Sequence, residues 1–275
     1  MMNNLVVGSS SQLAKYFPNS YERISSRNID LDRLSKSRWD SVYICFAEQR
    51  TYLASSKDMN ITNLFRDTNL DLTMQVIKAA MPVSRRVIFY STAELWNNCN
   101  GPVDSSLSFD YHGNLYTNTK NEMSRLLQNK DQFPNVSIVY PFNFNSIHRS
   151  GNYLFTRIFK SIVNNTKIEI GDVDFYREML HPSMVVKRCM EKSDSIGEDY
   201  IVGSGRVIHV GDFIQKLYSH FDMDFNSMVS INTTTPSIYR KNIFYSAEKT
   251  EEFFEDKLFD IIVDDLTSVM ENKHE

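Results

Sequence analysis

The stretch SVYICF at residues 41–46, the segment Thr62–Ala80 and the stretch RVIFY at residues 86–90 together decide the fold class. The first and third are short, apolar and rich in β-branched and aromatic residues, which is typical of strands buried on both faces. The segment between them carries apolar residues at nearly helical spacing, and Pro82 ends it. This order predicts two parallel strands that are joined by a helix.

The same alternation of strands and helices extends in both directions along the chain. Before these segments, Leu5–Val7 and Glu22–Ser26 are predicted strands, and Gln12–Phe17 between them is predicted to open a helix. After them, Tyr116–Gln128 is a predicted helix and Val136–Tyr140 a predicted strand. The pattern predicts an α/β protein with a doubly wound, Rossmann-like parallel sheet. Such sheets bind ligands beyond the carboxyl ends of their strands.

The predicted elements beyond residue 150 are shorter and mixed. The helices are expected at 152–163, 183–189, 210–221 and 248–270, and the strands at 167–170 and 200–202. We therefore predict a main domain over residues 1–150. Residues 151–275 are predicted to form mainly a smaller, mixed α/β lobe, with some segments returning to the main domain. The stretch 96–114 is rich in Asn, Ser and Gly and is a predicted loop.

Composition narrows the function classes. The chain has 275 residues, of which 41% are hydrophobic, so it can bury a full core. Its 30 Lys and Arg against 34 Asp and Glu provide no basic field for nucleic acid. No apolar run approaches the roughly 20 residues of a membrane helix, and the chain starts without a signal-peptide pattern. Three widely spaced cysteines match no zinc or disulfide pattern, so we expect a cytoplasmic protein without a metal site.

The turn after the first predicted strand has the spacing of a dinucleotide-binding turn. Gly8 supplies the tight turn, and the small Ala14 allows close packing of helix and sheet. Ser11 stands where a glycine would let a pyrophosphate approach the backbone, and an ordinary Gly/Ser turn is the alternative interpretation. The helix start after this turn offers N–H groups to phosphate. The candidate cofactor-binding residues here are Gly8, Ser10, Ser11, Gln12 and Leu13.

The end of the second predicted strand indicates which dinucleotide is bound. An NAD site usually has an acidic residue there, about 20 residues after the glycines, for the ribose 2′-OH. This chain has Ser26 and Arg27 instead. A guanidinium and a hydroxyl suit a 2′-phosphate, which favours NADP(H) and leaves NAD(H) as the alternative cofactor. The competing interpretation is that Arg27 is a solvated surface charge.

Tyr116 and Lys120 open a predicted helix and lie on one face of it, four residues apart. A nearby ammonium stabilises the phenolate form of a tyrosine, so Tyr116 can serve as an acid or base near neutral pH. Some 24 residues before Tyr116, the predicted strand ending at Tyr90 is followed by Ser91 and Thr92. A hydroxyl at this strand end can hydrogen-bond the same substrate oxygen as Tyr116.

From about residue 4 to residue 250 the chain resembles the extended short-chain dehydrogenase/reductases, the nucleotide-sugar epimerase, dehydratase and reductase family. The residues that match the family in order and spacing are Gly8, Ser11, Ala14, Ser91, Thr92, Tyr116 and Lys120. Other segments that resemble the family are Asp40–Ala47, Asn69, Tyr140–Asn143, Arg177–His181 and Val202–Gly205. The resemblance implies that Tyr116 exchanges a proton with the sugar oxygen, Lys120 binds the cofactor ribose, and Thr92 shares that oxygen.

The resemblance also implies the remaining site residues. The further cofactor-binding candidates are Phe46, Ala47, Tyr90, Pro141 and Asn143, and the substrate-binding candidates are Glu94, Asn143 and Arg177. Arg177 would hold the diphosphate or base of the substrate, and Glu94 would act as an acid/base or contact the sugar. Cys99 and His112 are weaker candidates for a second acid/base.

One departure from the family narrows the activity. The sugar 4,6-dehydratases carry Thr-Asp-Glu where this chain has Thr92-Ala93-Glu94, and the missing Asp argues against dehydration. The leading hypothesis is an NADP(H)-dependent reductase of a 4-keto-6-deoxy nucleotide-sugar in deoxysugar biosynthesis. The alternatives are a nucleotide-sugar epimerase with tightly bound NAD and a non-catalytic dinucleotide-binding relative. By resemblance only, the helices 62–80 and 116–128 are the candidate interface of a homodimer.

Overall fold

The computed structural model describes the chain except for residues 1–2, 54–57, 112, 233–241 and 274–275. Contacts divide the chain into two compact units. The first unit comprises residues 1–97, 105–141 and 185–202, and the second comprises residues 98–104, 142–184 and 203–275. The chain therefore crosses between the two units several times.

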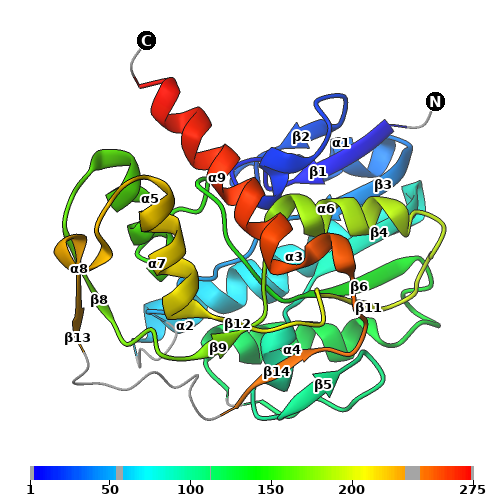
Figure 1. Cartoon of the computed structure of the whole chain (residues 1–275). Coiled ribbons are helices and arrows are strands. Elements are labelled where there is room, and N and C mark those ends of the chain that lie inside the picture. Colours follow the sequence, from blue (N-terminus) through cyan, green and yellow to red (C-terminus); the bar gives the residue numbers. More distant parts are fainter. Residues whose placement is uncertain (1–2, 54–57, 112, 233–241, 274–275) are drawn as a thin grey trace. The chain divides into compact units, whose positions relative to one another are not determined.

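A six-stranded parallel sheet forms the centre of the first unit (Figure 1). Its strands, in order across the sheet, are β11 (Tyr200–Val202), β6 (Val136–Pro141), β4 (Ser84–Tyr90), β3 (Trp39–Ile44), β1 (Asn3–Val7) and β2 (Glu22–Ile24). All neighbouring pairs are parallel. The chain runs from β1 outward to β2 and then returns to β3 on the other side of β1. The predicted doubly wound sheet is thus confirmed, and the strand order reverses at the carboxyl end of β1, where such folds bind ligands.

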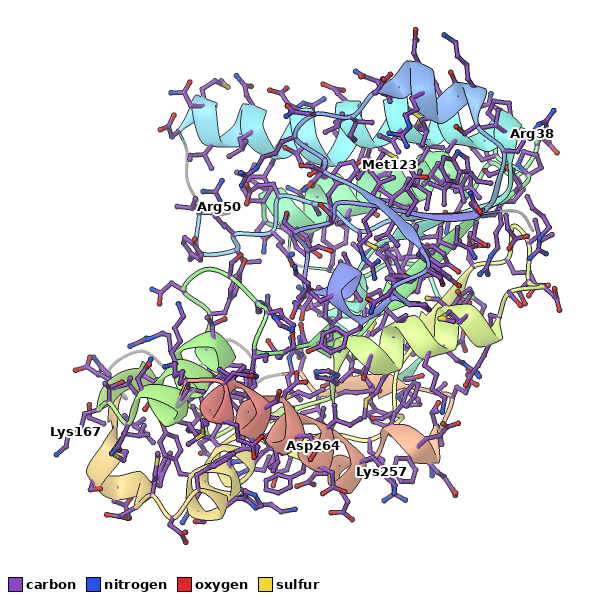
Figure 2. All side chains as sticks on the ribbon, turned by 90° about the horizontal axis from the view of Figure 1, so that it is seen from above. Arg38, Arg50, Met123, Lys167, Lys257 and Asp264 are labelled. Atoms are coloured by element: carbon purple, nitrogen blue, oxygen red, sulfur yellow. The ribbon has the colours of Figure 1, made fainter. Side chains whose placement is uncertain are left out.

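Helices cover both faces of this sheet. They are α1 (Leu31–Lys36), α2 (Met59–Arg66), α3 (Thr73–Ala80), α4 (Leu115–Leu127) and most of α6 (Pro182–Glu191). Side chains alternate along β4, so Phe89 and Arg86 point to opposite faces. Lys120 of α4 lies 4.6 Å from the ring centre of Phe89, whereas Arg86 donates to the carbonyl oxygen of Cys189 in α6. Figure 2 accordingly shows α3 and α4, which carries the labelled Met123, on one side of the strands and α6 on the other.

The predicted helix over 62–80 starts earlier and is not uniform. It begins at Met59, after Asp58 accepts a hydrogen bond from the backbone N–H of Asn60. Between α2 and α3, Asp67–Leu72 form a π-helical segment that the apolar spacing did not predict. This wider turn contains Asn69, whose side chain is 1% exposed. Such π segments often occur at functional sites.

The helix in the connection from β1 to β2 is shorter than predicted. The helix expected over 12–17 is a single 3₁₀ turn, η1 (Leu13–Tyr16). The chain cannot continue the helix through Pro18, which has no backbone N–H. The guanidinium of Arg23 on β2 instead donates to the carbonyl oxygens of Ala14, Phe17, Pro18 and Tyr21. One side chain thus satisfies the peptide oxygens that a longer helix would pair internally.

The second unit contains several helices and several short strand pairs. The helices α5 (Leu154–Asn164), α7 (Val210–His220) and α9 (Glu255–Glu271) pack through phenylalanine rings. Phe155 and Phe259 each contact Phe213, with ring centres 6.2 and 5.9 Å apart. The strand pairs are β5 (Gly101–Val103) with β14 (Phe244–Ser246), β7 (Asn143–Phe144) with β10 (Met179–Leu180), β8 (Ile168–Gly171) with β13 (Val229–Asn232), and β9 (Tyr176–Arg177) with β12 (Ile208–His209).

Several short elements complete the described chain. They are the 3₁₀ turns η3 (Met81–Val83), η4 (Ala93–Trp96) and η6 (Glu251–Phe253), and the helix α8 (Phe225–Met228). The predicted loop 96–114 contains β5, whose partner β14 lies more than 140 residues further along the chain. None of the helices in the described parts of the chain is long and apolar enough to cross a membrane.

Candidate active site

The hydroxyl groups that follow β4 have defined roles at the carboxyl edge of the sheet. The Ser91 Oγ lies 2.7 Å from the Ser124 Oγ on α4, in a buried hydrogen bond that ties the strand end to this helix. The Thr92 Oγ1 accepts a hydrogen bond of 3.2 Å from the backbone N–H of Glu94 and so caps η4. Because Thr92 is the acceptor in this bond, its hydroxyl proton can be donated to a substrate oxygen.

The start of α4 sets the position of Tyr116. Asn114 caps the helix by accepting a hydrogen bond of 3.0 Å from the Thr117 N–H, and the Thr117 hydroxyl accepts one of 2.9 Å from the Asn114 N–H. This reciprocal pair is a capping box, which fixes the first turn of the helix. Tyr116 lies in that first turn and is half-buried, and Lys120 follows one turn later on the same face.

Lys120 is buried at the end of β4. Its side chain is 3% exposed, and its Nζ donates a hydrogen bond of 2.6 Å to the carbonyl oxygen of Tyr90. The ring centre of Phe89 lies 4.6 Å from the same Nζ. Burial, which disfavours the charged ammonium, lowers the pKa of Lys120 from 10.5 to about 7. An amine with this pKa can exchange a proton near neutral pH or donate hydrogen bonds as an ammonium.

Gly8 has the conformation that the predicted cofactor turn requires. Its φ of 100° is in the region that favours glycine. A Cβ at this position would come within 2.9 Å of both the Cβ and the backbone N of Phe46. The ends of β1 and β3 therefore approach each other closely, and only a glycine fits between them. Ala14 is fully buried, which agrees with the close packing expected at that position.

The rest of this turn differs from the predicted phosphate cradle. The N–H groups of Gly8 and Ser9 both donate to the carbonyl oxygen of Ile24, and the Ser11 N–H donates to the Gly8 carbonyl. The Ser11 Oγ accepts from the Ala14 N–H at 3.2 Å. Because η1 is only four residues long, the expected effect of a helix N-terminus on phosphate does not apply here. Ser10 is exposed in this turn, while Gln12 and Leu13 are buried.

The other cofactor-binding candidates follow β2 and β3. Ser26 and Arg27 lie in the turn after β2, the edge strand, where Arg27 is exposed and its backbone N–H donates to the Ser25 Oγ. Phe46 is buried and Ala47 half-buried in the segment after β3. Figure 2 shows Arg38, which precedes β3, and Arg50, which follows it, at opposite ends of the first unit. Arg27 and Ala47 thus follow carboxyl ends of strands, as a dinucleotide site requires.

Asn69 joins the segment after β3 to the helix that carries Tyr116. Its Oδ1 accepts a hydrogen bond of 2.7 Å from the Glu48 N–H, and its Nδ2 donates to the Glu48 carbonyl at 2.9 Å. The same Nδ2 also donates to the Thr119 Oγ1 at 3.0 Å. Sequence reasoning identified Asn69 as a family position but missed this bridge. The bridge could not be read from spacing, because its two ends are 21 and 50 residues away.

The predicted site residues are divided between the two units. The first unit contains Tyr90, Thr92, Glu94, Tyr116, Lys120, Pro141 and the predicted cofactor turn. The second contains Asn143 on β7, paired with Met179 of β10, and Arg177 on β9. The Arg177 guanidinium is buried and lies 4.9 Å from the ring centre of Phe244. His112 lies outside the described residues, and the described ranges contain no group of three potential metal ligands.

Comparison with known proteins shows the fold of this chain. No protein-family model matches the sequence, and no curated protein matches it significantly. Among solved structures, RMD from Pseudomonas aeruginosa complexed with NADPH is similar over 99% of both chains, at 15% identity and a TM-score of 0.78. The UDP-N-acetylglucosamine 4-epimerase of Methanobrevibacter ruminantium M1, in complex with UDP-N-acetylmuramic acid, has 13% identity and a TM-score of 0.80 over 98% of this chain and 99% of its own.

A third similar structure extends the range of activities. The dTDP-glucose 4,6-dehydratase DesIV from Streptomyces venezuelae, as a double mutant with NAD and DAU bound, has 16% identity and a TM-score of 0.72 over 99% of this chain and 98% of its own. These similarities show that the chain has the fold of the extended short-chain dehydrogenase/reductases. The resemblance inferred from sequence motifs is confirmed at the level of the fold.

Proposed function

We propose that this chain is an NADP(H)-dependent enzyme that reduces a 4-keto-6-deoxy nucleotide-sugar, with Tyr116 as the proton donor. The observation that carries this proposal is the buried Lys120 at the carboxyl end of β4, one helical turn after Tyr116. The similar solved structures with bound NADPH or NAD support a nicotinamide dinucleotide as the cofactor. The proposed enzyme would act in cytoplasmic deoxysugar biosynthesis, as a homodimer.

The chain's own residues supply the proton and the orientation. The reduced nicotinamide supplies the hydride when it is bound. The Tyr116 hydroxyl gives a proton to the sugar oxygen as this oxygen gains negative charge, and the Lys120 ammonium stabilises the phenolate that remains. The Thr92 hydroxyl donates a hydrogen bond to the same oxygen and holds it in place.

Two features of the first unit fit a dinucleotide. The close approach of Gly8 to Phe46 leaves no room for a side chain at the turn after β1, as expected for the tight turn that opens a dinucleotide site. Ser26 and the exposed Arg27 follow β2 and offer a hydroxyl and a guanidinium to a 2′-phosphate. We therefore assign the NADP(H) preference to Arg27.

Three residues are assigned to the substrate by the resemblance to the family. Arg177 would bind the diphosphate, since a guanidinium recognises phosphate oxygens through paired N–H groups. Asn143 would hydrogen-bond the sugar, and Glu94 would contact it or act as an acid/base. Ala93 provides no carboxyl group for the removal of water, so reduction or epimerisation is favoured over dehydration.

A nucleotide-sugar 4-epimerase with tightly bound NAD is the second candidate. The similar solved structures include 4-epimerases, among them the one with a TM-score of 0.80. An epimerase would use Thr92, Tyr116 and Lys120 in both directions, first to oxidise and then to re-reduce one carbon. The two candidates differ in whether the cofactor is consumed.

Titration of the purified protein with NADPH and NADH, followed by fluorescence, tests the proposal. A panel of 4-keto-6-deoxy nucleotide-sugars is then added while the absorbance of the reduced nicotinamide is recorded. Preferential NADPH binding and stoichiometric oxidation with one sugar would support the reductase. Retention of NAD without net oxidation would favour the epimerase, and binding of neither cofactor would contradict both candidates.

A further inference from the structure

Glu178 is a fully buried carboxylate in the second unit, between β9 and β10. Its Oε1 accepts hydrogen bonds from the backbone N–H of Ser204, from the Ser204 Oγ at 3.2 Å and from the Gly205 N–H at 2.9 Å. Its Oε2 accepts one of 2.6 Å from the Ser246 N–H at the end of β14. One side chain therefore joins three segments that lie 26 to 68 residues apart in the sequence.

The space around this carboxylate is tightly closed. A Cβ at Gly203 would collide with the Glu178 Oε1 and with the Ser246 Cβ, and would come within 3.0 Å of a ring carbon of Phe142. Only a glycine at position 203 lets the turn Gly203–Gly205 close over the carboxylate. The turn Gly203–Gly205 thus packs directly against the carboxylate that accepts these hydrogen bonds.

One of the segments that Glu178 joins, the strand β14, also contacts Arg177. Glu178 directly follows Arg177 on β9, and Ser246 is two residues beyond Phe244 on β14. The guanidinium of Arg177 lies over the ring of Phe244, 4.9 Å from its centre. The ring of Phe142 packs against the ring of Phe244, and the two ring centres are 5.6 Å apart. The Glu178 carboxylate is therefore bonded to the strand that carries Phe244, and Glu178 follows Arg177 directly in the sequence.

Burial of this carboxylate is costly for folding. Burial raises the pKa of Glu178 from 4.5 to about 7, although all four hydrogen bonds act to lower it. Replacing it by an apolar side chain would leave three buried backbone N–H groups without an acceptor, which adds a further cost. The carboxylate is thus the common acceptor that holds these backbone segments together.

We propose that Glu178 is a positioning residue for substrate binding, whose carboxylate holds β14 and the turn Gly203–Gly205 against β9. It would thereby keep Phe244 beneath the Arg177 guanidinium in the place where this guanidinium binds the diphosphate of a nucleotide-sugar. This inference rests on the proposed function, in which Arg177 binds that diphosphate.

The chemistry of the four partners predicts which contact is lost when the charge is removed. Three of the four partners are backbone N–H groups, which can only donate, whereas the Ser204 hydroxyl can also turn to the Arg206 carbonyl oxygen. A hydrogen carried by the Oε1 position would oppose two of these N–H groups, and one carried by the Oε2 position would oppose only one. The hydrogen is therefore accommodated at the Oε2 position, where it opposes the Ser246 N–H. Protonation and the substitution Glu178→Gln should both release β14 and leave the turn attached.

Calorimetric binding of UDP-glucose, dTDP-glucose and GDP-mannose to the full chain tests the proposal. Glu178→Gln should weaken binding of the preferred nucleotide-sugar about tenfold, the size expected for a lost charge-assisted contact. Binding of NADPH should be unchanged, and under turnover KM should rise while kcat stays the same. The matched control is Glu169→Gln, which makes the same chemical change at an exposed position of β8 in the same unit. Arg177→Met provides the reference for loss of the diphosphate contact.

A pH series separates a positioning role from a merely structural one. In the wild type, nucleotide-sugar affinity should fall as the pH is lowered from about 8 to 6, through the pKa of about 7 of Glu178, and should approach that of Glu178→Gln. The variant should lack this transition. Other charged groups on the surrounding elements are Arg177 on β9, His181 after β10, His209 on β12, Arg206 after the turn and Glu248 after β14. They are present in both proteins, so the difference between the two pH profiles isolates Glu178.

The outcomes distinguish this inference from the proposed function. If the wild type and Arg177→Met bind no nucleotide-sugar, the proposed function fails and this inference fails with it. If Arg177→Met loses affinity but Glu178→Gln binds like the wild type with the same pH profile, only the role of Glu178 is overturned. Should Glu178→Gln fail to fold by near-UV circular dichroism, Ser204→Ala removes one of the four donors. It should weaken binding about threefold, and unchanged binding would overturn the role of Glu178.

Discussion

Two connections of the same parallel sheet are built very differently. The link from β1 to β2 contains only the single turn η1, whose carbonyl groups are bound by Arg23. The link that leaves β4 contains α4, a helix of 13 residues with a capping box and a buried lysine. Tyr116 and Lys120 must lie one helical turn apart, so their role requires a regular helix. The turn at Gly8 depends only on the backbone conformation of Gly8 and on the close approach of Phe46. Both are present although the helix that follows is a single turn.

The largest expected effect is the loss of the Tyr116 hydroxyl from α4. Tyr116→Phe should lower turnover about a thousandfold, because the sugar oxygen then has no positioned proton donor. Binding of NADPH, measured by fluorescence, should be unchanged. Tyr52→Phe, at a tyrosine that is 50% exposed, is the matched control and should keep full activity. If Tyr116→Phe keeps its activity, Tyr116 is not the proton donor, and the regular geometry of α4 has no role in catalysis.

The second effect concerns the pH dependence of stability. The pKa of Lys120 is about 7 in the folded chain against 10.5 for an ordinary lysine, so the unfolded chain binds more protons above pH 7. The free energy of unfolding should therefore rise between pH 7 and 8.5, by about 1–2 kcal/mol from this group. Urea unfolding of the cofactor-free Lys120→Met variant should lack this rise.

Lys78→Met serves as the control for this measurement, because Lys78 is an exposed lysine on α3. It should retain the pH dependence of the wild type. An equal slope in the wild type and in Lys120→Met would mean that Lys120 is not buried as a partly neutral amine.

A smaller effect is expected at the turn after β2. Arg27→Ala should weaken NADPH binding about tenfold and leave NADH binding unchanged, because only NADPH carries the 2′-phosphate. Arg38→Ala is the control. Arg38 is exposed and precedes β3, whereas Arg27 follows the carboxyl end of a strand. In Figure 2, Arg38 lies at the opposite end of the first unit from Arg50, which follows the carboxyl end of β3. Equal losses for NADPH and NADH would reassign Arg27 to a general surface charge.

The smallest effect is expected from substitution of Ser11, in the turn between β1 and η1. Ser11→Ala and Ser11→Gly both remove the Oγ that accepts from the Ala14 N–H. The free energy of unfolding should fall by about 1 kcal/mol for Ser11→Ala and by only a few tenths of that for Ser11→Gly. Only the glycine also opens the backbone to a pyrophosphate, so only Ser11→Gly should bind NADPH more tightly. If both variants bind NADPH equally, Ser11 does not limit the approach of the cofactor.

The strands of the sheet could be predicted because each is a short run of buried, β-branched and aromatic residues. Their ends shift slightly: β3 spans Trp39–Ile44 rather than 41–46, since Cys45 and Phe46 extend past its last pairing with β4. The π segment Asp67–Leu72 could not be predicted, because one wider turn scarcely alters the spacing of apolar residues. The two-residue strands such as β9 and β12 are too short to show any period.

The candidate site could be predicted only where its residues are neighbours in the sequence. Tyr116 and Lys120 follow from helical spacing, and Gly8 from the requirements of a tight turn. The Lys120 hydrogen bond to the Tyr90 carbonyl spans 30 residues, and the contacts of Glu178 span up to 68. Such contacts depend on how distant segments meet in three dimensions, which no local pattern of residues records. Pro18, by contrast, was a visible signal that the helix after Gly8 would be short.

The π segment has a thermodynamic consequence. Asn69 bonds to both backbone groups of Glu48 and to Thr119, so the segment that follows β3 cannot move without breaking bonds to α4. A molecule that orders the segment after β3 therefore also stiffens the helix beside Tyr116 and Lys120. Linkage is reciprocal. If binding at the segment after β3 changes the free energy of binding beside α4, then binding beside α4 changes the free energy of binding at that segment by the same amount. The amide of Asn69 thus makes two stretches of chain a single cooperative unit.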